Sequence, residues 1–228
     1  MIRIFFGNPG CGKTTCMVRN MKKMQKYPKT LHYRLCHSRF LSKYFIGAFT
    51  PKYPYIFSYY SNFESDFSEN INLKDLGKWT LPSNSYLCVD ESGIEYNSRK
   101  YKSLPQETIA WYKLYRHYEV KIIDFVSQSW EDMDVTIRRL ADELWYLRSF
   151  GPFTFVRRIY KWTGIDKETH QITDMYKFGS FIRRILPPPF HRKDWYLVFR
   201  PFHYKHFDSY ERYYLPTYEE WQEMQNNG

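Results

Sequence analysis

Short apolar runs, each ending at glycine or polar residues, punctuate the first 150 residues of the chain. A strand that is covered on both faces is apolar throughout, so such runs predict buried strands of a parallel sheet. Segments of helical composition lie between them, and this alternation predicts a layered α/β fold. In chain order, we expect strands at 2–6, 55–60, 86–89, 120–126 and 143–146, and helices at 13–26, 105–118 and 130–139.

The pattern changes after Gly151 to short strands rich in aromatic residues. Three consecutive prolines, 187–189, interrupt this region, and a further strand is predicted at 195–199. We therefore predict two parts: a main α/β domain over residues 1–150 and a small, aromatic-rich β extension over residues 151–228.

The composition indicates a globular protein, since 43% of the 228 residues are hydrophobic and 21% are aromatic. The longest candidate for a membrane span, Tyr44 to Phe63, contains Pro51, Lys52 and Pro54 and is interpreted as loop and strand. The N-terminal residues lack the pattern of a secretory signal. The four cysteines have no metal-ligand spacing, which favours a reducing cytoplasm. We expect a cytoplasmic protein without a transmembrane helix.

The net charge of +10 is concentrated near the N-terminus, where eleven Lys or Arg residues precede the first acidic residue, Glu64. Lys22, Lys23, Lys26 and Lys29 fall on the first predicted helix or just after it. They could meet nucleotide phosphates, nucleic acid or an anionic membrane surface, or they could form a solvated helix face.

The segment GNPGCGKT, starting at Gly7, matches the phosphate-loop pattern GxxxxGK[ST], directly after a predicted strand and before a predicted helix. In such a loop the backbone N–H groups converge on phosphate oxygens. Lys13 would reach the β- and γ-phosphates, and Thr14 would be a ligand of Mg²⁺. The predicted nucleotide-binding residues are Gly7, Asn8, Pro9, Gly10, Cys11, Gly12, Lys13, Thr14 and Thr15.

Two adjacent carboxylates, Asp90 and Glu91, follow the predicted strand 86–89. Asp90 is in the position of the carboxylate that holds the Mg²⁺ shell in a P-loop fold. Glu91 is placed to orient and polarise the water that attacks the γ-phosphate. An acidic pair at a helix N-terminus would look the same, but the complete phosphate loop favours ATP hydrolysis.

Three further polar residues are candidates for the catalytic site. Gln128 follows the strand 120–126. It could contact both the γ-phosphate and the attacking water, or be a surface residue. Arg138 and Arg139 could reach the nucleotide of a neighbouring subunit and stabilise the charge of the transition state. Structural ion pairs would explain the two arginines equally well.

Four blocks of the chain resemble the zonular occludens toxin (Zot) family, which includes the filamentous-phage gene I assembly proteins. The blocks are GNPGCGKTT from Gly7, YSNF from Tyr60, YLCVDESG from Tyr86, and the extended LYRHYEVKIIDFVSQSWEDMDVTIRRL from Leu114. The resemblance covers about residues 1–150. It implies a three-layer P-loop NTPase of the additional-strand type, similar to FtsK and HerA, and supports Glu91, Gln128 and an oligomeric ring by analogy.

The resemblance also implies a function: an ATP-driven motor that assembles and extrudes a filamentous, single-stranded DNA phage or a related mobile element. Its expected cofactors are ATP and Mg²⁺. Its expected partners are copies of itself, phage coat or assembly proteins, single-stranded DNA and an inner-membrane protein, since family members commonly carry a membrane-spanning helix that this sequence does not show. The alternatives are a DNA-translocating or packaging ATPase in the cytoplasm, a nucleotide-gated nucleic-acid-binding switch, and a small kinase.

Overall fold

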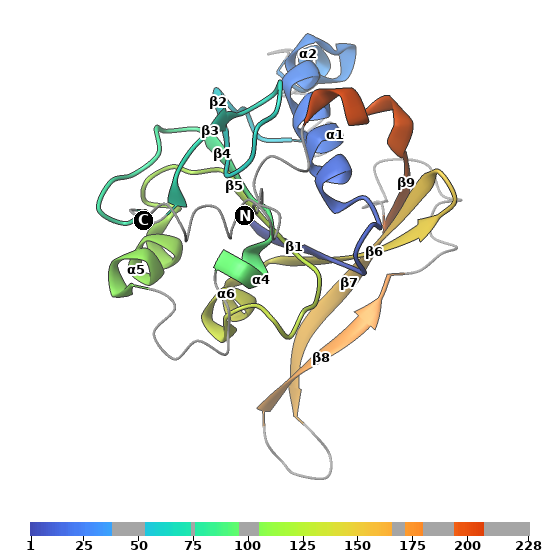
Figure 1. The fold of residues 1–228 in the computed structure, drawn as a ribbon. Helices are drawn as coiled ribbons and strands as arrows, with labels where there is room; N and C mark the ends of the chain where they lie inside the picture. Colours follow the sequence, from blue (N-terminus) through green and yellow to red (C-terminus); the bar gives the residue numbers. More distant parts are fainter. Residues whose placement is uncertain (38–52, 74–75, 96–104, 166–171, 180–193, 208–228) are drawn as a thin grey trace, which may run out of the picture.

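A computed structural model describes residues 1–37, 53–73, 76–95, 105–165, 172–179 and 194–207. Within these residues nine strands form one sheet (Figure 1). The strands are β1 (Ile2–Phe6), β2 (Ser58–Ser61), β3 (Glu69–Asn70), β4 (Ser85–Val89), β5 (Ile122–Ser127), β6 (Glu143–Phe150), β7 (Phe153–Ile165), β8 (Ile172–Phe178) and β9 (Trp195–Phe199). The helices are α1 (Lys13–Lys26), α2 (Leu31–Cys36), α4 (Ser92–Glu95), α5 (Gln106–Leu114) and α6 (Val135–Leu140), with short 3₁₀ turns η1 (Tyr27–Lys29), η4 (Arg200–Phe202) and η5 (Tyr204–His206).

The order of the strands is β3-β2-β4-β5-β1-β6-β7-β8, with β9 paired to β7. All neighbours from β3 to β6 are parallel, and β7 pairs antiparallel with β6, β8 and β9. Strand β5 lies between β1, which leads into the phosphate loop, and β4, which leads to Asp90. This inserted strand is the additional strand that the sequence analysis expected, and the mostly parallel sheet is confirmed.

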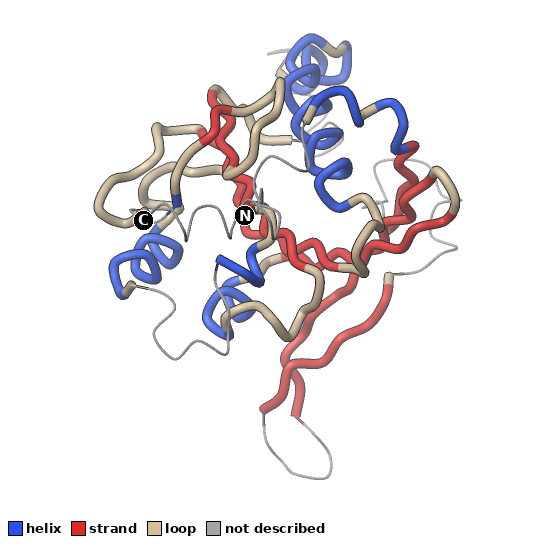
Figure 2. Tube along the Cα trace, viewed as in Figure 1, coloured by secondary structure: helices blue, strands red, loops and turns tan. Residues whose placement is uncertain are grey.

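Helices cover both faces of the sheet, as the tube in Figure 2 shows. Alternate residues of a strand point to opposite faces. In β1, Ile2 and Ile4 join the core beneath α5 and α6, whereas Phe5 joins the core beneath α1. Both cores are closed to solvent: Met17 and Met21 of α1 and Phe125 of β5 have essentially no exposed surface. The fold is therefore a three-layer α/β sandwich.

A buried ion pair lies inside the sheet, on the face that α1 covers. The guanidinium of Arg3 in β1 donates to both carboxylate oxygens of Asp124 in β5, at 2.6 and 2.5 Å. The Tyr86 hydroxyl of β4 donates to Asp124 at 2.7 Å, and all three residues are buried. Burial, together with the Asp124 charge, raises the pKa of Tyr86. These contacts join β1, β4 and β5, the three strands that carry the candidate site at their ends.

Residue 150, where the sequence predicts a boundary, falls at the turn between β6 and β7. Gly151 has a φ of 51°, which favours glycine, and the sheet continues across this turn through seven pairs of residues. Val156 of β7 and Val198 of β9 pack into the core beneath α1. In the described part of residues 151–228, strands β7, β8 and β9 belong to the same sheet as the preceding strands. The division into two domains stays a prediction.

Several predicted elements differ in length from those observed: the helix expected at 105–118 is Gln106–Leu114, and the strands expected at 55–60 and 120–126 are Ser58–Ser61 and Ile122–Ser127. Two further differences have a visible structural cause. The helix expected at 130–139 begins only at Val135, because the Asp134 side chain accepts from Thr136 N at 2.7 Å and caps the helix there. The strand expected at 143–146 runs on to Phe150, because β7 pairs with it from Leu144 to Phe150. Periodicity along one strand could not reveal this pairing.

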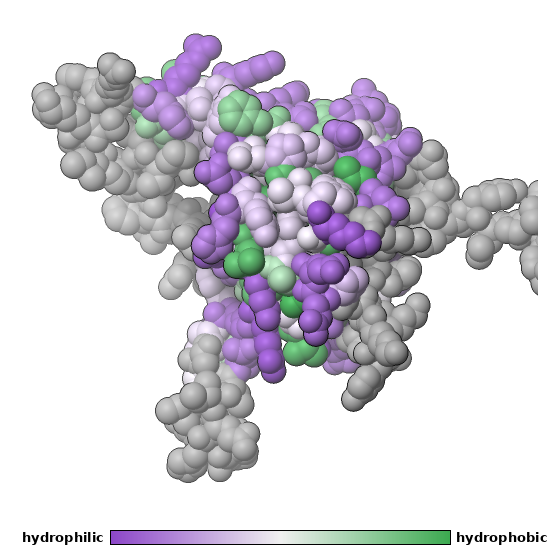
Figure 3. Space-filling view, turned by 90° about the vertical axis from the view of Figure 1, so that its left-hand side faces the viewer, coloured by the Kyte–Doolittle hydropathy of each residue, from purple (hydrophilic) through white to green (hydrophobic). Residues whose placement is uncertain are grey.

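None of the helices in the described residues is both long and apolar enough to cross a bilayer. In the predicted loop-and-strand segment 44–63, residues 44–52 lie outside the described part, and the remainder contains β2. The face in Figure 3 is mostly hydrophilic, with small, separate hydrophobic patches.

Candidate functional site

The candidate residues follow β1, β4 and β5, three parallel strands that are neighbours in the sheet. The carboxyl ends of parallel strands meet at one edge, where α/β proteins bind their ligands. The phosphate loop follows β1, the pair Asp90-Glu91 follows β4, and Gln128 follows β5. The fold therefore brings together segments that are far apart in the sequence.

The phosphate loop is held closely by its surroundings. A Cβ on Gly7 would come within 2.3 Å of the Leu147 carbonyl oxygen of β6, so only glycine fits there. Gly12, the residue before α1, has a φ of 84°, which also favours glycine. Asn8 and Pro9 are exposed at the tip, Cys11 is buried, and Thr15 is buried in the first turn of α1.

Lys13 is buried, and its ammonium group folds back over the loop. Its Nζ donates to the carbonyl oxygens of Gly7 at 3.1 Å and Asn8 at 3.3 Å. These bonds hold a positive charge at the loop, beside the N-terminus of α1. Both features favour an anion at this point, as the sequence predicts.

The Thr14 hydroxyl donates to Asp90 Oδ2 at 2.5 Å. This contact joins the start of α1 to the end of β4, 76 residues away. A hydroxyl and a carboxylate side by side fit Mg²⁺, which binds to proteins through one or two oxygen ligands and takes its remaining ligands from phosphates and water. Asp90 itself is buried, and its two carboxylate oxygens accept from the Thr14 hydroxyl and from Glu91 N.

Asn62 is a site residue that sequence reasoning did not single out, although it lies in the block YSNF. Its amide donates to the Asp90 carbonyl oxygen at 3.0 Å and accepts from Asp90 N at 2.8 Å. This pair of bonds fixes the backbone of Asp90 against the end of β2. A polar residue directly after a strand was the available signal, but β2 could not be placed beside β4 from sequence alone.

Glu91 and Gln128 lie side by side at the edge of the sheet. Gln128 Nε2 donates to the two carboxylate oxygens of Glu91, at 3.4 and 3.3 Å. Glu91 has a φ of 47°, a conformation that is uncommon in residues other than glycine and that occurs often at functional sites. Its N–H donates to Asp90 Oδ1 at 2.8 Å, which fixes the turn between the two carboxylates. A carboxylate and an amide in contact can together position a water molecule.

Arg138 and Arg139 are in α6, on the face of the sheet opposite α1 (Figure 1). The Arg138 guanidinium lies over the Trp130 ring at 5.6 Å, and Arg139 is exposed. No hydrogen bond joins either arginine to the phosphate loop among the contacts of the described residues. Their action on a neighbouring subunit stays a prediction.

Two residues of the predicted extension also reach the phosphate loop, and no sequence pattern pointed to either of them. The Thr154 hydroxyl of β7 donates to the Cys11 carbonyl oxygen at 2.6 Å. The Arg200 guanidinium of η4 donates to the Gly10 carbonyl oxygen at 2.8 Å. Burial raises the pKa of the Cys11 thiol, which suits a space-filling role for this side chain.

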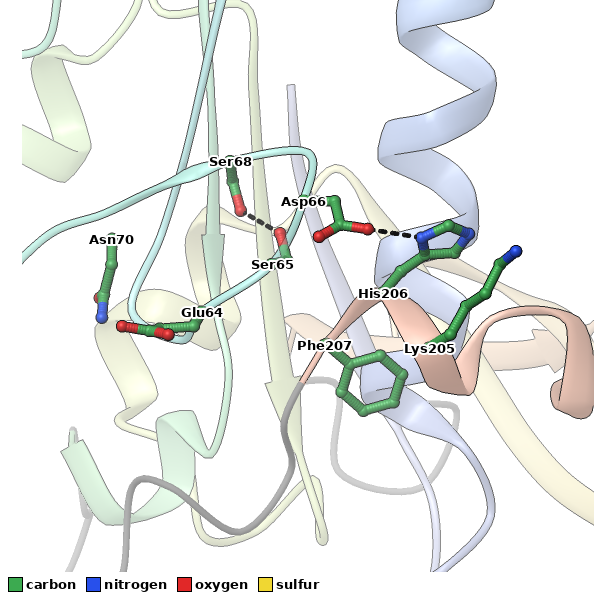
Figure 4. Close-up of a pocket in the computed structure, with 8 residues that line it drawn as sticks. All are labelled: Glu64, Ser65, Asp66, Ser68, Asn70, Lys205, His206 and Phe207. Carbon is green, nitrogen blue, oxygen red and sulfur yellow. Dashed lines mark hydrogen bonds and ion pairs between the residues drawn. The ribbon is translucent and has the colours of Figure 1, made fainter.

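A polar pocket of about 590 Å³ lies apart from these residues, between the loop after β2 and η5 (Figure 4). An ion pair of His206 and Asp66, with Nδ1 and Oδ2 2.6 Å apart, closes one side. Its lining contains none of the residues that the sequence predicts for nucleotide binding. The lining residues are Glu64, Ser65, Asp66, Ser68, Asn70, Lys205, His206 and Phe207.

The model of the family described as zonular occludens toxin (Zot) matches residues 1–169. The chain belongs to this family. The match includes the phosphate loop, both carboxylates, Gln128 and the two arginines of α6, and it extends past the 150 residues over which the resemblance was seen in the sequence. No curated protein matches the chain.

Among solved structures, the chain is similar to the N-terminal domain of zonular occludens toxin from Neisseria meningitidis, with 19% identity, 77% of this chain and 92% of that chain covered, and a TM-score of 0.46. It is also similar to the genome-packaging NTPase of Sulfolobus turreted icosahedral virus 2 in complex with ATP-γ-S, with 11% identity, 76% and 95% covered, and a TM-score of 0.36. A third is the flagellar accessory protein FlaH of Methanocaldococcus jannaschii, with 12% identity, 69% and 76% covered, and a TM-score of 0.35.

Proposed function

We propose that this Zot-family protein binds MgATP at the phosphate loop, hydrolyses it, and uses the energy to assemble and extrude a filamentous, single-stranded DNA phage or a related mobile element. The observation that carries the proposal is the meeting of Thr14 and Asp90, 2.5 Å apart, beside the contact between Glu91 and Gln128. The proposal assigns the first pair to Mg²⁺ and the second pair to the attacking water, beside one phosphate loop.

Each group has a distinct role in the proposed reaction. The loop N–H groups and Lys13 hold the β- and γ-phosphates, and Thr14 and Asp90 hold Mg²⁺, which neutralises the phosphate charge when bound. Glu91 accepts a proton from the attacking water, while Gln128 orients that water. In this proposal Asp90 serves the metal ion, and Glu91 serves the attacking water.

Family membership supports the phage-related part of the proposal. A ring of subunits, contacts with coat or assembly proteins, and peripheral attachment to an inner-membrane partner on the cytoplasmic side complete it. The exposed Lys23, Lys26 and Lys29, on α1 and η1, favour contact with an anionic partner such as single-stranded DNA.

The direct test is ATP turnover by the purified protein, with and without single-stranded DNA. If the protein is the proposed motor, we expect Mg²⁺-dependent hydrolysis that single-stranded DNA accelerates. A DNA-packaging ATPase would instead respond to double-stranded DNA. Slow hydrolysis that nucleic acid does not change, together with ATP-dependent DNA binding, would indicate a nucleotide-gated switch. Transfer of phosphate to a small molecule in place of water would indicate a kinase.

A further inference from the structure

The outer face of the phosphate loop is tied to the C-terminal part of the chain. In a loop whose N–H groups face the phosphates, the carbonyl groups point outward and need other donors. The hydroxyl of Thr154, which is fully buried, donates to the Cys11 carbonyl oxygen at 2.6 Å. Arg200 donates from one end of its guanidinium to the Gly10 carbonyl oxygen at 2.8 Å, and from the other end to that of Gly151.

The same two side chains pack against the loop as well as bonding to it. A Cβ on Gly12 would come within 2.5 Å of Thr154 Oγ1 and 2.6 Å of Arg200 Cδ. Arg200 is fixed in turn, because its backbone N–H donates to the Pro152 carbonyl oxygen at 3.0 Å. The loop is thus clamped between the β6–β7 turn and η4, which Figure 1 shows running back from β9 alongside α1.

We propose that Arg200 is a positioning residue of the nucleotide site, and that with Thr154 it holds the phosphate loop in its phosphate-binding conformation. The proposal rests on the proposed function, and it adds a residue outside the part of the chain that the family model matches, 1–169. A loop that is already ordered binds its ligand at a lower cost in conformational entropy. The guanidinium also adds a positive charge behind a loop that binds an anion.

Equilibrium binding of a fluorescent ATP analogue with Mg²⁺ tests the clamp without requiring turnover. Arg200→Ala should weaken binding by about tenfold, the scale of one lost charged hydrogen bond. Arg200→Lys should recover only part of this loss, because an ammonium group cannot span two carbonyl groups as a guanidinium does.

Arg157→Ala is the matched control. Arg157 is half-buried like Arg200 and also donates to a glycine carbonyl, that of Gly179, at 3.1 and 2.8 Å. Gly179 follows β8, which is three places from β1 in the sheet, and no hydrogen bond or ring contact of Arg157 reaches the phosphate loop among the described residues. Both alanine variants should unfold at similar urea concentrations, while only Arg200→Ala loses ATP affinity. Equal affinity in the two variants would overturn the clamp, and so would a loss in Arg200→Ala that merely follows its loss of stability.

Thr154 provides a second, independent arm of the test. Thr154→Val removes the hydroxyl at nearly constant volume. Because both side chains act on one loop, the double variant Thr154→Val, Arg200→Ala should lose less ATP affinity than the product of the fold-losses of the two single variants. Strict multiplication would contradict a shared clamp. If the unmodified protein binds ATP but does not hydrolyse it, the proposed function fails while the binding comparison still decides the clamp.

Discussion

Replacing Glu91 by Gln should separate ATP binding from ATP hydrolysis. The Glu91 side chain makes bonds of 3.3 and 3.4 Å with the exposed Gln128, and such long bonds near solvent contribute less than about 1 kcal/mol to stability. The bond that fixes the turn, from Glu91 N to Asp90, is made by the backbone and survives the change. Folding and ATP affinity should therefore stay close to those of the unmodified protein.

The hydrolysis step should suffer much more. An amide has the shape of the carboxylate but cannot take a proton, so the rate should fall by roughly 10² or more, which is about 2.7 kcal/mol of barrier. Single-turnover hydrolysis and ATP binding should be measured on the same samples, with Glu107→Gln as control, because Glu107 is exposed in the first turn of α5 and loses the same charge. Lost binding with an unchanged rate per bound nucleotide would refute the assignment and make Glu91 a metal-site residue.

Three further predictions concern the sheet, the C-terminal segment and assembly. Arg3→Met leaves Asp124 buried without its cation and should lower the free energy of unfolding, measured in urea, by about 3–5 kcal/mol. Adding Asp124→Leu to this variant should restore much of the lost stability. Burial, followed by nearby positive charges, lowers the pKa of His203 from 6.5 to about 4, so the unfolded chain binds the proton more readily than the folded chain. The free energy of unfolding should therefore fall as the pH drops from 6.5 to 4, and it should fall less steeply in His203→Asn. An Arg138→Ala, Arg139→Ala chain mixed with a Lys13→Ala chain should regain some ATP turnover, because some interfaces would join an intact phosphate loop to an intact arginine. If mixing restores no turnover at any protein concentration, the arginines have only a structural role.

The sequence predicts the bounds of an element well where the local sequence signals match the structure that the element adopts in the fold. The strand at Ile2–Phe6 and the helix at Lys13–Lys26 have the predicted bounds, because an apolar run, a glycine loop and a helical segment each carry their own signal. Placing Asp90 near Thr14 needed only the rule that the carboxyl ends of parallel strands in one sheet lie at the same edge. The family resemblance supplied the inserted strand, which no periodicity could reveal.

The rest of the site depends on contacts between segments distant in the sequence. Asn62, Thr154 and Arg200 bond to the backbone of site residues, and a bond to a carbonyl or N–H group leaves no mark on the sequence of its partner. Asn62 lies 28 residues from Asp90, and Arg200 lies 190 residues from Gly10. Such contacts follow from strand order and the path of the C-terminal segment, which a pattern of apolar residues does not encode.

Phosphate release by the unmodified protein and by Lys13→Ala decides whether the phosphate loop binds ATP for hydrolysis. Lys13 is buried, and its Nζ lies 3.1 Å from the Gly7 carbonyl oxygen, so its charge is held at the loop. We expect Mg²⁺-dependent phosphate release by the unmodified protein and none above background from Lys13→Ala, with both proteins folded by circular dichroism. Equal release from the two proteins, or none from either at saturating MgATP, would show that the loop is not a site of ATP hydrolysis.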